Sequence, residues 1–416
     1  MSRGKRLLGL GLAGAVLVSG ALWARRQWDP ARFRAFPRLR LEGWVADHPD
    51  DADALYELGR RYRQEGQLTD ARQALERAAR LEPGNARLLS DLGELYAAGG
   101  DYPRAQALFE QAVRLRPDLS RPHRSLGDLA GISRNYALAI QHYRQALALR
   151  PDDVRALTSL GSAYADSLNR GEAEAAFRRA IALAPRSSEP YQRLGLALYK
   201  FNDYTGARAA LQQALERDPN DPYTHLFLGL ACARQLRSAG DERQALQHFD
   251  RAVARGYSGG EADYGRGLVY LRRKDYPHAI AALEAAIQRD GGGEDARYRL
   301  VRAYFAAGQT AKGQGMLKQF ERFKQTEPET RRLSYRLALQ PGDTAARRRL
   351  ARLCVETGRY REALLQYRVL MGAGAADSEL FRDMARAATA VGDTRLAELA
   401  RASLRQTASR SATTQH

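Results

Sequence analysis

Two short glycine-containing motifs have the composition of catalytic or cofactor-binding loops. Residues 9–14 read Gly-Leu-Gly-Leu-Ala-Gly, which is the spacing of a dinucleotide-binding turn. Residues 256–260 read Gly-Tyr-Ser-Gly-Gly, which is the spacing of a hydrolase nucleophile elbow. Both motifs need a β-strand directly before them. Neither has one, because the first lies inside an apolar run and the second lies between two expected helices. We therefore predict no catalytic and no cofactor-binding residues.

The histidines and cysteines do not indicate a metal site either. The seven histidines are scattered, and none is paired with a cysteine or a carboxylate at the spacing that a metal ion needs. Cys232 and Cys354 fall on apolar positions of helices that are several repeats apart, so we expect no disulfide between them. The sequence thus predicts a protein that is not an enzyme and uses no cofactor.

The N-terminal segment predicts a membrane anchor. Residues 7–23 are uncharged and apolar, they follow three basic residues, and their length is at the lower limit for a membrane-spanning helix. A secretory signal that is cleaved near Ala21, which would leave a secreted protein, is the alternative. We favour the anchor because the apolar run continues past Ala21, and because Trp23 and Trp28 suit a membrane interface.

The charges around this segment favour opposite sides of the membrane for the rest of the chain. Residues 25–40 hold six arginines, against three basic residues before the apolar run, and this favours a cytoplasmic body under the positive-inside rule. A short basic stretch before an apolar run is typical of export. We favour an extracytoplasmic body held at the cell membrane by a single span, with the cytoplasmic side as the alternative.

A 34-residue period dominates the rest of the chain, and glycine, proline and two alanines recur with it. The glycines are Gly59, Gly93, Gly127, Gly161, Gly195 and Gly229, and the prolines are Pro49, Pro83, Pro117, Pro151, Pro185 and Pro219. Apolar residues within 55–62 have the spacing of one helix face, and those within 71–78 have it again before Pro83. Each period therefore predicts a pair of helices, whose small residues let the two backbones approach closely.

This pattern resembles the tetratricopeptide repeat family. The second repeat shows it best, with Leu89, Leu92, Gly93, Tyr96, Ala105, Phe109, Ala112 and Pro117. The match is strong over residues 52–253 and weaker beyond them. The resemblance implies an all-α fold, a right-handed solenoid of antiparallel helix pairs that forms a superhelix, and a role in binding other proteins.

The predicted organisation follows from the period. We assign residues 1–26 to the anchor or signal, 27–51 to a linker and a capping helix over about 34–46, and 52–256 to repeats one to six. We assign 257–325 to degenerate repeats seven and eight, 326–405 to further degenerate helical repeats, and 406–416 to a disordered tail. Repeat six has 16 residues from Gly229 to Ala245 where repeat one has 12 from Gly59 to Ala71, so four extra residues lie around 235–240.

In the resembled family the first helix of each repeat lines a concave surface. The residues that would face it are polar or small in repeats one to four, and apolar or aromatic in repeats five to eight. We predict a groove for a peptide or helix of a partner protein, formed by Leu196, Tyr199, Tyr223, Leu226, Leu230, Tyr264, Leu268, Leu271, Tyr298, Arg302 and Phe305. The basic residues at its rim would be Arg193, Lys200, Arg234, Arg272 and Arg299. The alternative is that other helices cover this stripe and make it core.

The net charge of +18 comes from three stretches, residues 1–40 (+8), 331–368 (+7) and 401–416 (+3). The rest of the chain has no net charge, which argues against a basic groove along its whole length. The ten arginines of 331–368 support an alternative function, the binding of nucleic acid or of an anionic membrane surface. A solvated helix face explains the same arginines without a ligand, and we favour that interpretation.

Overall fold

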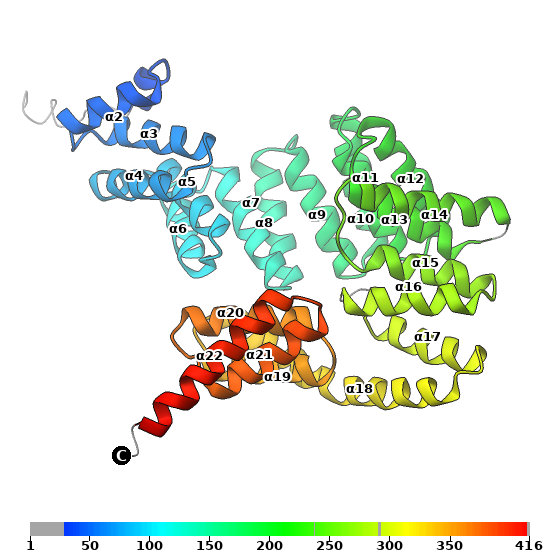
Figure 1. The fold of residues 1–416 in the computed structure, drawn as a ribbon. Helices are drawn as coiled ribbons and strands as arrows, with labels where there is room; N and C mark the ends of the chain where they lie inside the picture. The colour runs from blue at the N-terminus through cyan, green and yellow to red at the C-terminus, as the bar shows by residue number, and fades with distance from the viewer. Residues whose placement is uncertain (1–28, 237, 290–292, 414–416) are drawn as a thin grey trace, which may run out of the picture. The chain divides into compact units, whose positions relative to one another are not determined.

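The computed structural model describes residues 29–236, 238–289 and 293–413, and within these ranges it contains helices and no β-strand (Figure 1). The all-α prediction is therefore confirmed for the described part of the chain. The predicted membrane segment, residues 7–23, lies outside the described residues. None of the described helices combines the length and apolar character that crossing a membrane requires.

The chain forms two compact units, Met1–Leu160 and Gly161–His416. The helices that begin in the first unit are the 3-10 helix η1 (Pro30–Phe33), α2 (Arg38–Asp47), α3 (Ala52–Gln64), α4 (Leu68–Leu81), α5 (Ala86–Ala98), α6 (Tyr102–Leu115), α7 (Ser120–Ile132), α8 (Tyr136–Leu149) and α9 (Val154–Asp166). The helices of the second unit are α10 (Arg170–Leu183), α11 (Glu189–Lys200), α12 (Tyr204–Arg217), α13 (Pro222–Arg234), α14 (Ala239–Ala254), α15 (Glu261–Arg272), α16 (Tyr276–Gln288), α17 (Gly293–Ala306), α18 (Thr310–Leu339), α19 (Thr344–Glu356), α20 (Tyr360–Gly372), α21 (Ser378–Ala390) and α22 (Thr394–Thr413).

Helix starts repeat with the period of the sequence. Helices α3 and α5 begin after Asp51 and Asn85, whose side-chain oxygens each accept a hydrogen bond of 3.2 Å from the backbone N–H three residues on. Helices α6 and α8 begin in the same way after Asp101 and Asn135. Each cap satisfies an N–H group that a helix start leaves without an intrahelical partner. Both helices of a pair therefore begin at positions that the sequence repeats.

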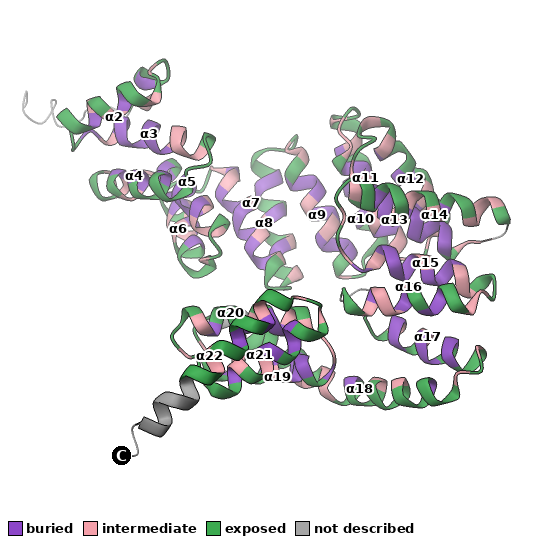
Figure 2. Ribbon diagram, in the orientation of Figure 1, coloured by how far each residue is buried: buried purple, intermediate pink, exposed green. Residues whose placement is uncertain are grey.

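Glycine allows the two helices of a pair to pack closely. A Cβ atom at Gly93 would lie 2.7 Å from Cε1 of Phe109, and one at Gly127 would lie 2.6 Å from Cε1 of Tyr143. Carbon atoms in favourable contact are about 3.5–4.0 Å apart, so only glycine fits beside these rings. Phe109 and Tyr143 are buried. Figure 2 shows buried positions on each of the helices α5 to α8, which form these two pairs.

Tyrosine and glutamate connect successive pairs. The hydroxyl of Tyr96 on α5 donates a hydrogen bond of 2.6 Å to Glu76 on α4, which precedes it by 20 residues. Tyr62 donates to Glu42 in the same way across 2.8 Å. Tyr304 donates to Glu284 at the same separation in the degenerate part of the array. In these three places the repeat tyrosine holds a first helix against the second helix before it.

The N-terminal cap begins later than predicted. A helix is expected over about residues 34–46, whereas the structure has η1 followed by α2, which begins at Arg38. Pro37 explains the later start, because a proline disfavours the helical conformation in the residue before it. Phe33 and Leu41 are buried in one cluster with Leu55 of α3, so the segment still covers the end of the first pair.

The predicted boundary between residues 325 and 326 falls inside a helix. Helix α18 runs without a break from Thr310 to Leu339, although it contains Pro328. This proline is exposed, and unlike Pro83 it is not followed by a glycine that would turn the chain. Phe323 of α18 is buried between the guanidinium groups of Arg297 and Arg359, which lie 4.4 Å and 5.6 Å from its ring centre. These contacts connect α17, α18 and the start of α20.

The C-terminal tail is partly helical. The sequence predicts disorder over residues 406–416, whereas α22 extends to Thr413. No glycine or proline occurs after Gly392, and alanine, arginine and glutamine are good helix formers. The helix therefore continues beyond the last apolar positions of the repeat pattern.

Candidate functional site

The first helices of repeats five to seven lie side by side in the second unit. Helix α11 contacts α13, and α13 contacts α15, in addition to the contacts that each makes with its own pair partner. Helix α17 is the first helix of the next pair. The predicted groove residues lie on these four helices, and the structure divides them into three groups by burial.

Four predicted groove residues are core residues of this unit. Leu226, Leu230, Tyr264 and Leu268 have exposed fractions of 2%, 5%, 6% and 8%, and all four belong to one hydrophobic cluster. Neighbouring first helices cover them, as the alternative interpretation of the stripe requires. Leu196, Tyr199 and Leu271 are half-buried and pack against the same cluster.

The remaining four predicted residues are exposed, but they do not form one continuous surface. Tyr298 and Phe305 on α17 are 47% and 41% exposed, and the guanidinium of Arg302 lies 5.8 Å from the Tyr298 ring centre. Tyr298 faces Phe320 of α18 across 6.0 Å between ring centres. Tyr223, 57% exposed, packs instead against Tyr257 in the loop before α15.

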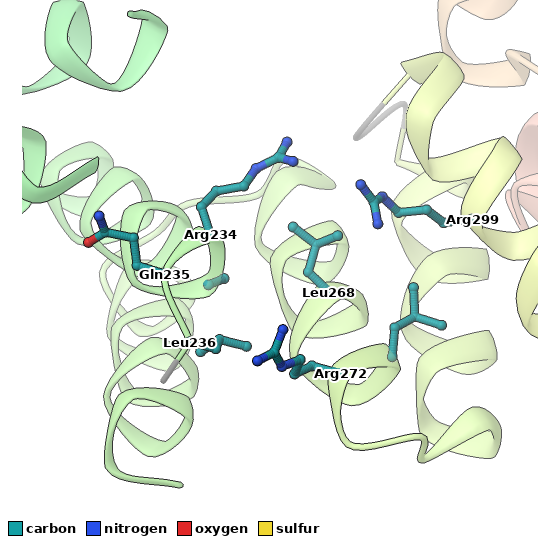
Figure 3. Close-up of a pocket in the computed structure, with 8 residues that line it drawn as sticks. Arg234, Gln235, Leu236, Leu268, Arg272 and Arg299 are labelled. Carbon is teal, nitrogen blue, oxygen red and sulfur yellow. The ribbon is translucent and has the colours of Figure 1, made fainter. Parts of the chain in front are cut away.

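A pocket of about 570 Å³ opens on the side of the first helices, between α13, α15 and α17. Leu268 and Leu271 of α15 form its apolar base, and Arg234, Arg272 and Arg299 stand around it. In Figure 3 the guanidinium groups of Arg234 and Arg299 point toward the space beside Leu268, and Arg272 and Leu236 lie on the other side of that space. The pocket thus combines apolar carbon with positive charge.

Hydrogen bonds orient two of these arginines. Arg234 donates to the hydroxyl oxygen of Tyr264 across 3.3 Å and, less closely, to that of Tyr199 across 3.5 Å. The Tyr264 hydroxyl donates to Asp295, which also accepts a hydrogen bond of 2.6 Å from Arg299. The network therefore runs from α11 to α17 and holds Arg234 and Arg299 on either side of Tyr264.

The pKa values of this network keep its charges fixed near neutral pH. Burial, and then the hydrogen bond to Asp295, raises the pKa of Tyr264 to about 12, so the phenol is neutral. Burial alone would raise the pKa of Asp295, but the hydrogen bonds from Arg299 and Tyr264 outweigh it and lower this pKa, so the carboxylate is charged. Three arginines and one carboxylate leave the pocket with two positive charges.

Sequence reasoning named the arginines of this pocket as rim residues but missed its wall. Gln235 and Leu236 line the pocket, and they lie in the loop between α13 and α14 of repeat six. Gln235 is held by a hydrogen bond of 2.8 Å to Thr205, and Ser238 then caps α14. The interval of 16 residues from Gly229 to Ala245 marks this repeat as irregular in the sequence, but it does not identify the residues of the wall.

The other two predicted rim residues lie outside the pocket. Lys200 pairs with Asp166 across 2.7 Å, and Arg193 is exposed on α11. Neither lines the cavity that Arg234, Arg272 and Arg299 surround. The positive charge of this face is therefore concentrated near repeat six.

The arginines of residues 331–368 are largely paired within the chain. Six of them lie within ion-pair distance of a carboxylate, which supports the interpretation of a solvated, salt-bridged helix face. The pairs are Arg331 with Glu327 (3.1 Å), Arg336 with Asp343 (2.6 Å), Arg349 with Glu329 (2.9 Å), Arg359 with Glu362 (3.5 Å), Arg348 with Asp377, and Arg352 with Glu379. Phosphates of a nucleic acid would have to compete with these carboxylates for each guanidinium.

Of the two motifs that resemble catalytic loops, residues 9–14 lie outside the described residues, and residues 256–260 lie between two helices. Ser258 is exposed in the loop between α14 and α15, as predicted from its position between two helices. Cys232 and Cys354 are buried, free thiols, as predicted. In residues 29–236, 238–289 and 293–413, no group of three or more histidine, cysteine or acidic side chains is placed to hold a metal ion.

The arrangement of the described helices shows which class of protein this is. Antiparallel helix pairs that recur every 34 residues and contact mainly their neighbours in the chain are those of a helical-repeat protein. The chain belongs to the tetratricopeptide repeat family. Models described as tetratricopeptide repeat match residues 62–129, 169–231 and 270–337, a second such model matches 21–86 and 233–294, and one described as TPR repeat matches 135–167. Proteins of this family generally act as scaffolds that bind other proteins.

Several solved structures are similar to this chain at low sequence identity. A tetratricopeptide repeat protein from Parabacteroides merdae is 17% identical, with a TM-score of 0.48 over 61% of this chain and 98% of that chain. The pilF protein of Pseudomonas aeruginosa is 19% identical, with a TM-score of 0.42 over 48% and 89%. A chain of the APC/C hetero-tetramer Cut9–Hcn1 is 16% identical, with a TM-score of 0.49 over 76% and 58%. No curated protein matches the sequence.

Proposed function

We propose that the chain is a non-enzymatic scaffold that binds a partner polypeptide on the side of the first helices α13, α15 and α17. The observation that carries this proposal is the pocket between these helices, with an apolar base of Leu268 and Leu271 and arginines around it. Helix α17, which supplies Arg299 to the pocket, also carries two partly exposed aromatic side chains, Tyr298 at 47% and Phe305 at 41%. Aromatic and arginine side chains are the residues that most often dominate binding energy at protein interfaces.

The proposed surface differs from the stripe predicted from sequence. The four buried residues of that stripe, which include Leu230 and Tyr264, belong to the core under the surface. The partner would contact Leu271, Tyr298, Phe305 and the arginines. A face of this kind suits an extended peptide or a single helix, because both present alternating apolar and charged side chains. Its function needs no cofactor, and we propose none.

Binding by paired surface variants tests this proposal. Full-length protein and a Tyr298→Ser, Phe305→Ser double variant would each be used to capture partners from the cells that make the protein. We expect the double variant to lose the partner, because two exposed aromatic anchors are removed without opening a core cavity. Leu365→Ser together with Leu399→Ser is the matched control, since these side chains are 58% and 61% exposed on other helices. Equal capture by the test variant and the control would contradict the proposal.

We further propose that residues 7–23 hold the scaffold at the cell membrane, with the repeats on the extracytoplasmic side. The apolar run of these residues supports a single span. Full-length protein should sediment with membranes, and deletion of residues 1–26 should release it. A labelling reagent that does not cross the membrane should modify a cysteine introduced at exposed Leu138 in intact spheroplasts. Wholly soluble protein that begins after Ala21 would show a cleaved signal instead.

The paired arginines of 331–368 make nucleic-acid binding the weaker candidate. Several of their guanidinium groups already pair with carboxylates such as Glu329 and Asp343, with which phosphates would have to compete. In the pocket between α13, α15 and α17 only Arg299 pairs with a described carboxylate, Asp295, so Arg234 and Arg272 are left for an anionic partner group.

A further inference from the structure

The loop between the two helices of repeat six builds one wall of the pocket. Helix α13 ends at Arg234, as the regular 34-residue pattern requires, and the chain then continues through Gln235 and Leu236 before α14 begins at Ala239. Leu236 is half-buried against the same hydrophobic cluster as Leu268 and Leu271. The loop thus places an apolar side chain against the core at the edge of the pocket.

Only one of the three arginines of the pocket, Arg299, pairs with a carboxylate of the described chain. Arg234 bonds to tyrosine hydroxyls, and Arg299 bonds to Asp295, which is the only carboxylate among their described hydrogen-bond partners. Arg272 is exposed and forms no ion pair with a described residue. Its neighbour Arg273, by contrast, pairs with Glu242 across 2.5 Å. Arg272 therefore remains available to a carboxylate of a partner, whereas Arg273 is already paired within the chain.

The guanidinium group of Arg234 is held in position before a partner binds. Two tyrosine hydroxyls hold its guanidinium group beside the pocket, so part of the entropy of ordering a long side chain is already lost before a partner arrives. Arg guanidinium groups bind carboxylates through paired N–H donors. A carboxylate that enters the pocket would meet Arg272 from one side, and Arg234 or Arg299 from the other (Figure 3).

We propose that this pocket binds the side-chain carboxylate of a glutamate or aspartate in the partner segment, with an apolar neighbour of that residue against Leu236, Leu268 and Leu271. The proposal rests on the scaffold function above and names the chemistry of its partner. An acidic peptide fits better than a nucleic acid, because the pocket has an apolar base and a track of phosphates needs basic side chains along its length. The pocket is selective for segments in which acidic and apolar residues alternate.

Matched synthetic peptides test this inference. The probes are fluorescein-labelled peptides of about twelve residues, amidated at the C-terminus, that carry glutamate between leucines, and the same peptides with glutamine in place of glutamate. Binding to the full-length protein is measured by fluorescence anisotropy. We expect the wild-type protein to bind the glutamate series about 5- to 50-fold more tightly, a range typical of one buried charge-assisted contact. The Arg272→Gln variant should lose most of that preference, and Arg273→Gln should keep it.

Several other results of this experiment would overturn the acidic-pocket inference. Equal binding of glutamate and glutamine peptides, or an unchanged preference in Arg272→Gln, would overturn the acidic-pocket inference and leave the scaffold proposal standing. Tighter binding of a peptide with a free C-terminal carboxylate, regardless of its side chains, would also overturn it. Preferential binding of a labelled single-stranded oligonucleotide, lost in Arg272→Gln, would replace the peptide by a nucleic acid. Failure of all peptides to bind, together with failure of the Tyr298 and Phe305 test, would overturn both proposals.

Discussion

The ring of Phe249 on α14 occupies the space that a side chain at Gly265 on α15 would fill. A Cβ atom at Gly265 would overlap the ring, and one at Gly229 on α13 would lie 2.8 Å from Cε1 of the same ring. Phe249 is fully buried. One phenylalanine therefore fixes the spacing of two successive first helices beneath the proposed binding surface.

Substitution of Gly265 should consequently destabilise the array. We expect Gly265→Ala to lower the free energy of unfolding by about 1–3 kcal/mol, because the buried ring must move to admit a methyl group. Gly43→Ala is the control, since Gly43 lies within α2 and a Cβ atom there would have no neighbouring atom within 4 Å. Alanine in a helix interior should stabilise by about 0.5–1 kcal/mol there. Denaturant unfolding followed by circular dichroism measures both, and equal effects of the two changes would contradict this packing.

Substitution of Tyr264 and of Tyr298 should distinguish a core residue from a residue of the proposed binding surface. It is 6% exposed, so we expect Tyr264→Ala to reduce the free energy of unfolding by about 3–5 kcal/mol through the cavity that it leaves. Tyr298→Ala, at an exposed position on α17, should change it by less than about 1 kcal/mol. Thermal melts of the full-length variants test this pair. An unchanged melting temperature for Tyr264→Ala would show that Tyr264 is not part of the core.

Two histidines contact each other between α13 and α14, the two helices of one pair. Nδ1 of His225 lies 3.1 Å from Nδ1 of His248, and Nε2 of His225 lies 3.1 Å from the Pro219 carbonyl oxygen. A carbonyl only accepts hydrogen bonds, so Nε2 of neutral His225 is the donor there, and its Nδ1 must accept from His248. Protonation of His225 would place two N–H groups against each other. The pair is therefore stable in its neutral form.

This contact predicts a loss of stability in mild acid. Burial, and then the charge of His225, lowers the pKa of His248 to about 4, and burial lowers the pKa of His225. The unfolded chain takes up protons below its ordinary pKa of about 6.5, so the contribution is complete above pH 6.5 and is lost as the pH falls toward 4. We expect the melting temperature to fall between about pH 7.5 and 5, and to fall less in His248→Gln. Leu365→Gln, at an exposed position without a titrating group, should retain the wild-type slope, and identical slopes in all three proteins would contradict the account.

The arginines of residues 331–368 should stabilise the fold and should not bind nucleic acid specifically. Arg348 contacts Asp377 and donates a hydrogen bond of 2.7 Å to the carbonyl of Ala375, so Arg348→Gln should lower the melting temperature. Labelled duplex DNA should bind the full-length protein only at the non-specific level, with a Kd of about 1–100 µM at physiological salt. Tighter binding that disappears in Arg348→Gln would support the nucleic-acid alternative.

The helix pairs could be predicted from sequence because their determinants are local and periodic. Gly93 and Ala105 recur where two backbones meet, and Asn85 and Asp101 recur where helices begin. Such signals depend on residues within one repeat or the next. The bounds of α18 could not be predicted in this way, because Pro328 lies inside the helix and no repeated glycine marks its end.

The binding surface was harder to predict for a different physical reason. Periodicity places Leu230 and Tyr264 on a face of their helices, but it does not say whether an adjacent first helix covers that face. In the structure α13 and α15 are close enough to bury both residues. Arg272 on α15 and Tyr298 on α17 remain exposed. The wall at Leu236 was visible only as a change in repeat length.

Site-specific photo-crosslinking tests the central claim most directly. A benzophenone amino acid would replace Tyr298 on α17 or, as the control, Leu183, which is 46% exposed on the second helix α10. Each full-length variant would be irradiated in the cells that make the protein, and the crosslinked chains would be identified by mass spectrometry. We expect a discrete partner polypeptide to crosslink from position 298 and not from position 183. Crosslinks of the same partner from position 183 alone, or equally from both positions, would contradict binding on the side of the first helices.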